Sequence, residues 1–141
     1  MVKSYEGDRV GFSVGEGVLA GLRRGARGES TTLFTVLAAA YALVLGRAAG
    51  QDRLILGIPA AGRHHPQLDG VVGNFVDLLA VPLETDDLMT ARELLHRSHD
   101  RLVRAQREAG VSFRQLVDGL GVGRDLSTSP LVQAVLALQS V

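Results

Sequence analysis

Residues 53–63 read Arg-Leu-Ile-Leu-Gly-Ile-Pro-Ala-Ala-Gly-Arg, and residues 75–83 read Phe-Val-Asp-Leu-Leu-Ala-Val-Pro-Leu. The first run is compact, rich in β-forming residues and closed by Pro59, so it predicts a buried strand over Arg53–Ile58. The second run is apolar with Pro82 near its end, and it predicts a central strand over Phe75–Leu83. The polar residues 60–70 predict a loop. Two strands joined by a long loop are therefore the frame on which the rest of the chain is placed.

A long helix is expected before these strands. Ser30 is a suitable N-cap, a helix over Thr31–Ala49 follows it, and Gly50 provides the C-terminal stop. The apolar residues of this helix cover almost its whole circumference, which predicts a helix buried on most sides. Farther upstream, Arg9–Val14 alternates between apolar and polar residues and predicts a short strand. A weak helix that ends near Gly25 is expected between the two.

Two capping boxes predict helices in the C-terminal half. Thr90–Glu93 opens a helix to about Glu108, and Ser112–Gln115 opens a shorter one, because each box satisfies orphan backbone donors. The apolar run Leu131–Leu138 predicts a closing strand. The order β-α-α-β-β-α-α-β predicts the α/β fold class. We expect one layered lobe, with helices packed on a mixed β-sheet, and residues 1–141 as a single domain.

Composition excludes several classes of function. The 15 basic and 15 acidic residues give a net charge of zero, which argues against a nucleic-acid-binding surface. The chain has no cysteine, so disulfides, thiolate zinc sites and cysteine nucleophiles are excluded. The longest apolar stretch, from Leu33 to Leu45, is shorter than the roughly 20 residues that a membrane span needs. We therefore expect neither a nucleic-acid nor a membrane partner, and a cytoplasmic location.

Three segments, in this order, resemble the condensation domains of nonribosomal peptide synthetases. Leu56–Arg63 followed by Leu68–Leu78 resembles the family's G-x-P-x-A-G-R stretch and the V-G-x-F-V-N-T stretch after it. Val111–Phe113 stands where the family usually has H-Q-D-x-P-F-E. Arg124–Leu131 matches R-D-x-S-x-x-P-L at every specified position. The helix segment Thr32–Leu37 is also typical, and the resemblance covers roughly residues 10–141.

The resemblance implies a chloramphenicol acetyltransferase-like fold of two lobes in a V. Such domains join an aminoacyl or peptidyl thioester on one carrier protein to the amine on another. Their catalytic H-H-x-x-x-D-G lies in the N-terminal lobe and faces a tunnel between the lobes. This chain resembles the C-terminal lobe, in part. The implied partners are the missing N-terminal lobe and peptidyl carrier proteins. The phosphopantetheine would belong to the carriers, with no cofactor bound directly by this chain.

The family motifs imply a set of tunnel or structural residues in this sequence. These are Gly73, Phe75, Val76, Asp77, Phe113, Arg124, Asp125, Ser127 and Pro130. Two departures stand out: Asp77 replaces the usual Asn, and residues 108–110 (Glu-Ala-Gly) replace H-Q-D. Asp77 is expected to face the tunnel, the alternative being a solvated strand edge.

The last motif segment has two readings that can both hold. Arg124 and Asp125 brace the tunnel wall, or Asp125 starts a turn capped by Ser127 or Ser129 ahead of Pro130.

Residues His64-His-Pro-Gln-Leu-Asp-Gly70 match H-H-x-x-x-D-G literally, but we interpret the match as a decoy. The segment lies between Gly62-Arg63 and Val72-Gly73, where the family has a variable polar loop. A histidine that acts on an amine needs a fixed orientation and a water-excluded site, and a polar loop supplies neither. His64, His65, Asp69 and Gly70 are thus expected to be non-catalytic, and no catalytic residue is expected in this chain.

Two further histidines, His96 and His99, are three residues apart on the predicted helix, and Asp100 follows them. Histidines at this spacing can share a metal ion, but a site needs more ligands than two. The sequence suggests no third ligand. A surface or boundary pair is therefore the preferred interpretation, and no metal site is predicted.

Three hypotheses for function remain open on the sequence. The first is one lobe of an amide-forming condensation domain, inactive by itself. The second is a free-standing acyltransferase that uses His65 and completes its active site between subunits of a homo-oligomer. The third is a non-catalytic module that binds a carrier protein or a partner lobe through apolar surface.

Overall fold

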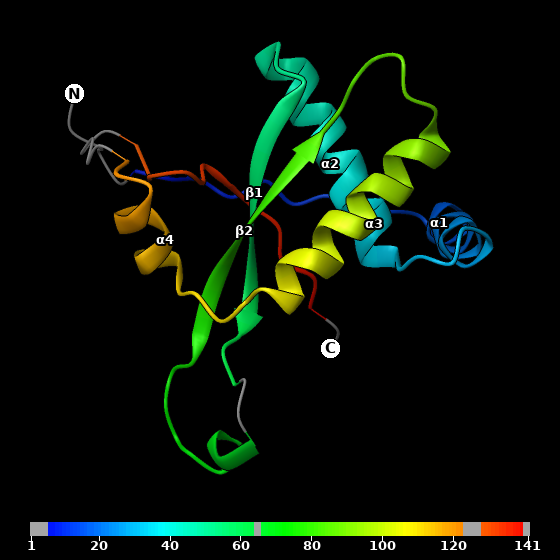
Figure 1. Cartoon of the computed structure of the whole chain (residues 1–141). Helices are drawn as coiled ribbons and strands as arrows, with labels where there is room; N and C mark the ends of the chain where they lie inside the picture. Colours follow the sequence, from blue (N-terminus) through cyan, green and yellow to red (C-terminus); the bar gives the residue numbers. More distant parts are fainter. Residues whose placement is uncertain (1–5, 64–65, 123–127, 140–141) are drawn as a thin grey trace.

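The computed structural model describes residues 6–63, 66–122 and 128–139 (Figure 1). Helices and a small sheet alternate along the chain, as expected for an α/β lobe. The elements in chain order are α1 (Glu16–Gly28), α2 (Leu33–Ala49), β1 (Arg53–Ala61), the 3-10 turn η1 (Pro66–Leu68), β2 (Val76–Glu84), α3 (Ala91–Arg107), α4 (Phe113–Gly119) and β3 (Ala134–Val135).

The sheet is mixed and has the strand order β2-β1-β3. Strands β1 and β2 are antiparallel, with a register that runs from Arg53 opposite Glu84 to Ala61 opposite Val76. Strand β3 is parallel to β1. The hairpin of β1 and β2 continues past the helices and carries its connecting loop away from the body of the lobe (Figure 1). The predicted pair of strands is confirmed, and both are slightly longer or shifted toward the C-terminus.

Two prolines lie inside these strands, at positions where no ladder hydrogen bond is lost. The carbonyl of Gly57 accepts from the amide of Leu136, so the backbone groups of Gly57 point toward β3. Pro59 lies two residues after Gly57, so its backbone nitrogen also points toward the β3 side of β1. Strand β3 pairs only with Leu56 and Gly57, so no partner for this nitrogen is lost. By the same alternation Pro82 points its nitrogen away from β1, to the outer edge of β2. Strand β1 therefore continues through Pro59 instead of ending at it.

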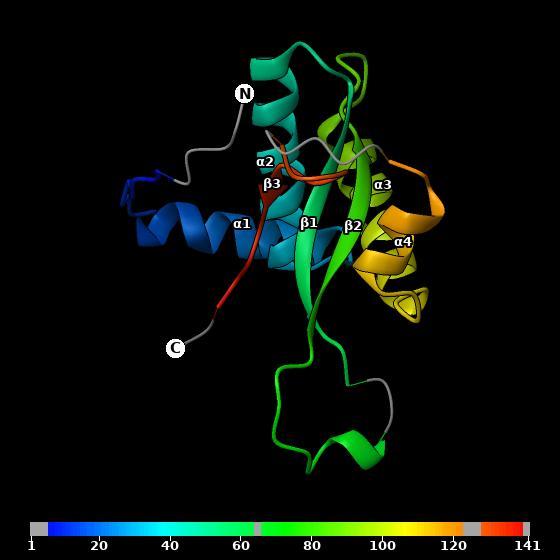
Figure 2. The ribbon, with the colours of Figure 1, turned by 90° about the vertical axis from the view of Figure 1, so that its left-hand side faces the viewer.

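The hydrophobic core lies between one face of the sheet and the helices α2 and α3. Figure 2 shows both helices on the same side of the β1–β2 pair. The buried members of the core are Ala38, Ala42, Leu56, Ile58, Leu79, Val81, Leu83 and Leu102. The fully buried side chains that α2 contributes to the core are the alanines Ala38 and Ala42, and Phe34, Tyr41 and Leu45 pack against it while partly buried. The opposite side of α2 is open, with Val44 64% exposed. Apart from this side and the last turn, the residues of α2 are buried or half-buried, so the prediction of a helix buried on most sides is confirmed.

Local capping signals decided the ends of the helices, with one correction. Both predicted capping boxes, Thr90 with Glu93 and Ser112 with Gln115, are formed. Gly50 has the left-handed conformation expected of a C-terminal stop, with φ of 63°. The N-cap of α2 is Thr32, whose side chain accepts from the amide of Thr35, and not Ser30. Ser30 has φ of 53° and belongs to the turn before the helix.

Two predicted strands differ from the structure. Residues 9–14 pair with no strand in the described part of the chain. The predicted closing strand Leu131–Leu138 is reduced to Ala134–Val135. Both sequences have strand-like composition, but a strand exists only where a neighbouring edge supplies hydrogen bonds. The strand-like pattern of these residues therefore predicts an extended backbone, but it does not identify a neighbouring strand with which to pair.

The described helices do not meet the requirements of a membrane span. No single helix among them is long and apolar enough to cross a bilayer. Helices α1 and α2 pass by length and composition only as a pair, and they are bent by 106° at the break between them.

Glu29 links the end of α1 to α3. Its carboxylate lies 2.9 Å from the Arg92 guanidinium and 3.1 Å from Nε2 of His96. The hydrogen bond from Arg92, followed by that from His96, holds the pKa of the Glu29 carboxyl below its ordinary value. A lowered pKa means that the folded protein favours the charged form.

This pKa predicts a pH-dependent loss of stability. At neutral pH the wild type is expected to have a higher Tm than Glu29→Gln. The difference should shrink as the pH falls below the ordinary range of a glutamate and through the lowered pKa of Glu29, because the wild-type carboxyl then becomes neutral as well. Thermal unfolding of both proteins across this range measures it, with Asp100→Asn as a control on α3. A Tm difference that is independent of pH would contradict the assignment.

Candidate functional site

The first and second motif segments meet at Asp77. Its carboxylate accepts from the backbone amide of Phe113 at 3.3 Å, at the start of α4. It also accepts from the amide of Leu78 at 2.8 Å. Asp77 lies opposite Ala60 on the helix-covered face of the sheet and is half-buried. The carboxylate therefore fixes the first turn of α4 to the start of β2, and it is half-buried although β2 is an outer strand of the described sheet.

Val132, the residue that follows the third motif segment, reaches the first segment at Gly57. A Cβ atom built on Gly57 would lie 2.6 Å from Cγ1 of Val132, which shows how closely the C-terminal segment crosses β1. Val132 is 4% exposed, and its amide donates to the carbonyl of Pro130 at 2.6 Å. We call Gly57, Asp77, Phe113 and Val132 the motif junction. Residues from three separate parts of the sequence thus converge on the β1–β2 pair.

Arg63 organises the loop between β1 and β2. Its guanidinium lies 4.3 Å from the centre of the Phe75 ring and donates to the carbonyls of Leu68 and Val71. The amide of Gly62 donates to the carbonyl of Phe75 at 2.7 Å. A cation over an aromatic face and two hydrogen bonds to carbonyls hold the base of the loop together. Phe75 therefore has a structural partner in this chain.

An apolar pocket of about 290 Å³ adjoins the motif junction. It lies between β2, the end of α3 and α4. Its lining consists of Leu78, Leu79, Ala80, Ala105, Glu108, Ala109, Val111, Phe113 and Leu116. Two of the residues that replace the family's H-Q-D, Glu108 and Ala109, are part of this lining. The pocket thus presents mostly apolar surface, with the one carboxylate of Glu108, next to the Asp77–Phe113 contact.

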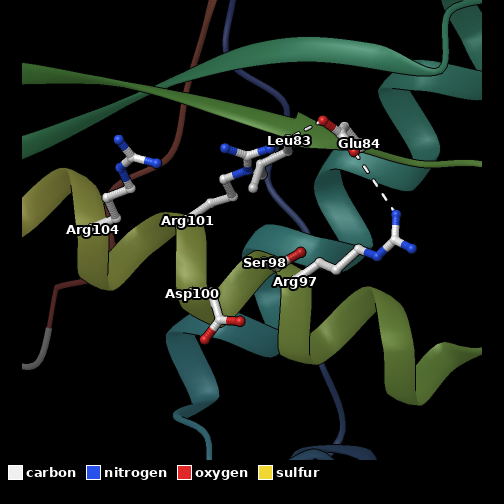
Figure 3. A pocket seen from close by; sticks show the side chains of 7 residues that line it. All are labelled: Leu83, Glu84, Arg97, Ser98, Asp100, Arg101 and Arg104. Carbon is white, nitrogen blue, oxygen red and sulfur yellow. Dashed lines mark hydrogen bonds and ion pairs between the residues drawn. The ribbon is translucent and has the colours of Figure 1, made fainter.

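A second pocket, of about 370 Å³, is lined by arginines of α3 (Figure 3). Glu84 lies between two of them, 3.2 Å from Arg101 and 3.8 Å from Arg97. Arg104 pairs with Glu108 at 3.0 Å. Because these guanidinium groups already face carboxylates of the same chain, the pocket has little unbalanced positive charge for a ligand.

The literal H-H-x-x-x-D-G match is only partly within the described residues. His64 and His65 lie outside them. Asp69 and Gly70 are exposed, and the amide of Asp69 donates to the carbonyl of Pro66 at 3.2 Å in a turn. Arg124, Asp125 and Ser127 of the third motif segment also lie outside the described residues. Of the remaining expected residues, Gly73 and Val76 flank Phe75 at the base of the loop, and both are exposed.

His96 and His99 point to different partners. Nε2 of His96 contacts Glu29, whereas Nδ1 of His99 lies 3.4 Å from the hydroxyl of Thr35 on α2. Within the described ranges, no three residues of the metal-binding types gather into a possible site. The two imidazoles thus connect α3 to its neighbours instead of facing one another.

The sequence interpretation missed two residues of this region. Val132 lies in a predicted strand, but nothing in the sequence showed that it would cover Gly57. Arg63 belongs to a motif segment, but the motif alone suggested no role for it. A glycine inside a β-rich run is a signal for close approach of another backbone or side chain, and it would have indicated Gly57.

The arrangement of the mixed sheet, with two helices on one face, is found in solved synthetases and condensation domains. A solved four-domain nonribosomal peptide synthetase, bound to AMP and glycine, superposes on 95% of this chain with a TM-score of 0.90 and 26% sequence identity. The condensation domain of the monacolin K polyketide synthase superposes on 86% of this chain with a TM-score of 0.76 and 24% sequence identity. The expected chloramphenicol acetyltransferase-like fold class is confirmed.

Sequence comparison gives the family. The condensation-domain family matches residues 1–141, and the chain belongs to this family. Surfactin synthase subunit 1 of Bacillus subtilis is 37% identical over 99% of the chain, and phosphinothricin tripeptide synthetase PhsB of Streptomyces viridochromogenes is 37% identical over 99% as well. The chain spans 4% and 12% of the lengths of these relatives. It also covers 10% of the four-domain synthetase and 29% of the monacolin condensation-domain chain.

Proposed function

We propose that this chain is part of the C-terminal lobe of a condensation domain and supplies one wall of the tunnel in which an amide bond forms. The family membership and the motif junction carry the proposal. The expected tunnel residues Asp77 and Phe113 are in contact, because the Asp77 carboxylate accepts from the first amide of α4. The apolar pocket beside them would form part of the wall.

The reaction proposed for the whole domain follows from its family. The amine nitrogen of the acceptor substrate attacks the thioester carbonyl carbon of the donor substrate. The new carbon–nitrogen bond replaces the carbon–sulfur bond, the donor's phosphopantetheine leaves as a thiol, and the amine loses a proton. The histidine motif for this step would lie in the other lobe. Both phosphopantetheine arms would belong to carrier proteins, and a cytoplasmic location is part of the same proposal.

Within this lobe, Asp77 is proposed to act through position and not as a proton carrier. Its carboxylate is held by two backbone amides, from Leu78 and Phe113. An Asn, which the family usually has, could accept the same hydrogen bonds through its side-chain oxygen. The departure from Asn to Asp is therefore compatible with a shared role in placing α4 against β2.

The test compares the isolated chain with a complete domain. A chimera would carry this chain in place of the aligned residues of surfactin synthase subunit 1. With loaded donor and acceptor carriers, we expect amide formation by the chimera and background turnover by the isolated chain. His65→Ala should leave the turnover of the chimera unchanged, because the loop is not part of the proposed chemistry.

Two outcomes would overturn the proposal. Turnover by the isolated chain that is lost in His65→Ala would support the free-standing acyltransferase instead. A chimera whose helices fold but that makes no amide would show that this chain cannot provide the tunnel wall.

A further inference from the structure

Leu131 has a left-handed backbone conformation, with φ of 60°, directly after Pro130. The amide of Val132 donates to the carbonyl of Pro130 at 2.6 Å, so three consecutive residues close a hydrogen-bonded turn. A bond from the amide of residue i+2 to the carbonyl of residue i, with positive φ at the central residue, is the rare and strained kind of γ-turn. Leucine is unfavourable at its centre, because the Cβ atom crowds the carbonyl oxygen that follows.

The strain has to be held by contacts outside the turn. Within the described ranges, the residues other than glycine with positive φ are Leu131 and Ser30. Ser30 lies in the short turn between α1 and α2, where its amide donates to the carbonyl of Arg27 at 3.1 Å. A residue keeps such a conformation only where the surrounding structure enforces it, and positions of this kind cluster at functional sites. Leu131 is half-buried, so neighbours are present to enforce it.

The residues after the turn are fixed on β1. Val132 is 4% exposed, and its Cγ1 atom lies 2.6 Å from a Cβ atom built on Gly57. Cγ2 of Val135 reaches the same built atom at 3.1 Å. In a regular strand these two valines would face opposite sides, because an odd number of residues separates them. The chain before β3 is therefore not a straight continuation of that strand, and it bends on the way to β3 at Leu131 and Gln133.

The turn brings the chain onto the face of the sheet opposite the core. Leu56 and Ile58 belong to the core, so Gly57 between them points to the other face. Val132 covers Gly57 on that face. Leu131, the residue before it, is the last residue of the third motif segment, for which the family resemblance implies tunnel residues. The γ-turn thus lies between a motif segment and the point at which the chain is fixed to the sheet.

We propose that Leu131 is a positioning residue of the condensation reaction. Its γ-turn sets the direction in which the chain extends from Val132 back into the third motif segment, and so places Pro130 in the tunnel wall. Leu131 acts through the backbone and touches neither substrate. This inference rests on the proposed function, because it assumes that the wall lines the reaction chamber.

The stability of two variants of the chimera tests the backbone conformation. Alanine is ordinarily more stable than glycine in a folded chain, because glycine loses more conformational freedom on folding. At a residue with positive φ the order is reversed, because glycine has no Cβ atom to crowd the backbone. We therefore expect a higher Tm for Leu131→Gly than for Leu131→Ala. The two variants lack the same side-chain contacts beyond Cβ, so those contacts do not affect the comparison.

The turnover of two further variants separates the backbone from the side chain. Leu131→Asn keeps a similar side-chain size and tolerates positive φ, whereas Leu131→Val keeps the apolar character and disfavours positive φ strongly. With loaded carriers, at a temperature at which every variant is folded, we expect the kcat of Leu131→Asn to stay close to that of the wild type. The kcat of Leu131→Val should fall roughly 10-fold, because a displaced tunnel wall misplaces the substrates. An apolar packing role for Leu131 predicts the reverse order.

Ser30→Val is the matched control, because it places the same β-branched residue at the other described position with positive φ, in the turn between α1 and α2. It should lower the Tm of the chimera and leave its kcat unchanged. Equal kcat values for the folded asparagine and valine variants at position 131 would reduce the turn to a structural role and overturn the inference, while the proposed function stands. A Tm for Leu131→Ala at or above that of Leu131→Gly would show that the γ-turn does not form, with the same consequence. A folded wild-type chimera without amide formation would overturn the proposed function and the inference together.

Discussion

Gly57→Val is expected to lower the free energy of unfolding by about 3 kcal/mol, the upper part of the usual range for an overfilled core. A Cβ atom at this position would lie 2.6 Å from Cγ1 of Val132 and 3.1 Å from both Cδ1 of Leu78 and Cγ2 of Val135. Valine adds two further carbons to that crowded space. Because Val132 and Val135 belong to the C-terminal segment, the substitution should displace this segment from β1. Chemical denaturation measures the loss.

A double-mutant cycle identifies the cause. Gly57→Ala alone should be destabilising, and the addition of Val132→Ala should make the combined loss smaller than the sum by roughly 1 kcal/mol. Gly17→Ala is the matched control, because a Cβ atom at Gly17 meets nothing within 4 Å and alanine favours the helix. Additive losses from Gly57→Ala and Val132→Ala would contradict the close contact between β1 and the C-terminal segment.

Asp77→Ala is expected to cost about 2 kcal/mol, because it leaves the half-buried amides of Leu78 and Phe113 without their acceptor. Asp77→Asn should retain most of the stability, since its side-chain oxygen can still accept. In the chimera, Asp77→Ala should also reduce amide formation, because α4 loses its fixed position beside the apolar pocket. Denaturation gives the first effect, and turnover with loaded carriers gives the second.

The comparison of the two variants separates positioning from proton transfer. A positioning role predicts that Asp77→Asn supports turnover close to that of the wild type, with an unchanged pH profile. Asp100→Asn, on the exposed side of α3, serves as the control for the loss of one negative charge. Equal losses of turnover in Asp77→Asn and Asp77→Ala would show that the charge itself is required and that Asp77 does more than position α4.

Much of the fold was predictable because its signals are local. The capping boxes at Thr90 and Ser112 act within three residues, so the sequence is sufficient to place the starts of α3 and α4. The β1–β2 pair follows from two apolar runs that are joined by a polar loop. The order of the motifs indicated the condensation family, which the family comparison confirmed.

Local signals were insufficient where two alternatives had similar propensity. Ser30 and Thr32 are both good N-caps, and the turn before α2 decided for Thr32. Pro59 predicts the end of a strand, but β1 continues through it. Its missing N–H lies on the side of β1 where β3 pairs only with Leu56 and Gly57. In each case the neighbouring elements, and not the segment's own residues, set the outcome.

The helices, the hairpin and the family could be predicted from the residues alone, because they depend on periodicity, caps and motif order along the chain. The tertiary structure alone decided that Asp77 holds the amide of Phe113, 36 residues away, and that Val132 covers Gly57. It also decided that residues 9–14, with a strand's pattern, have no strand to pair with in the described chain. Hydrogen bonds and packing between distant segments require both partners in space, and the sequence of one partner does not specify the other.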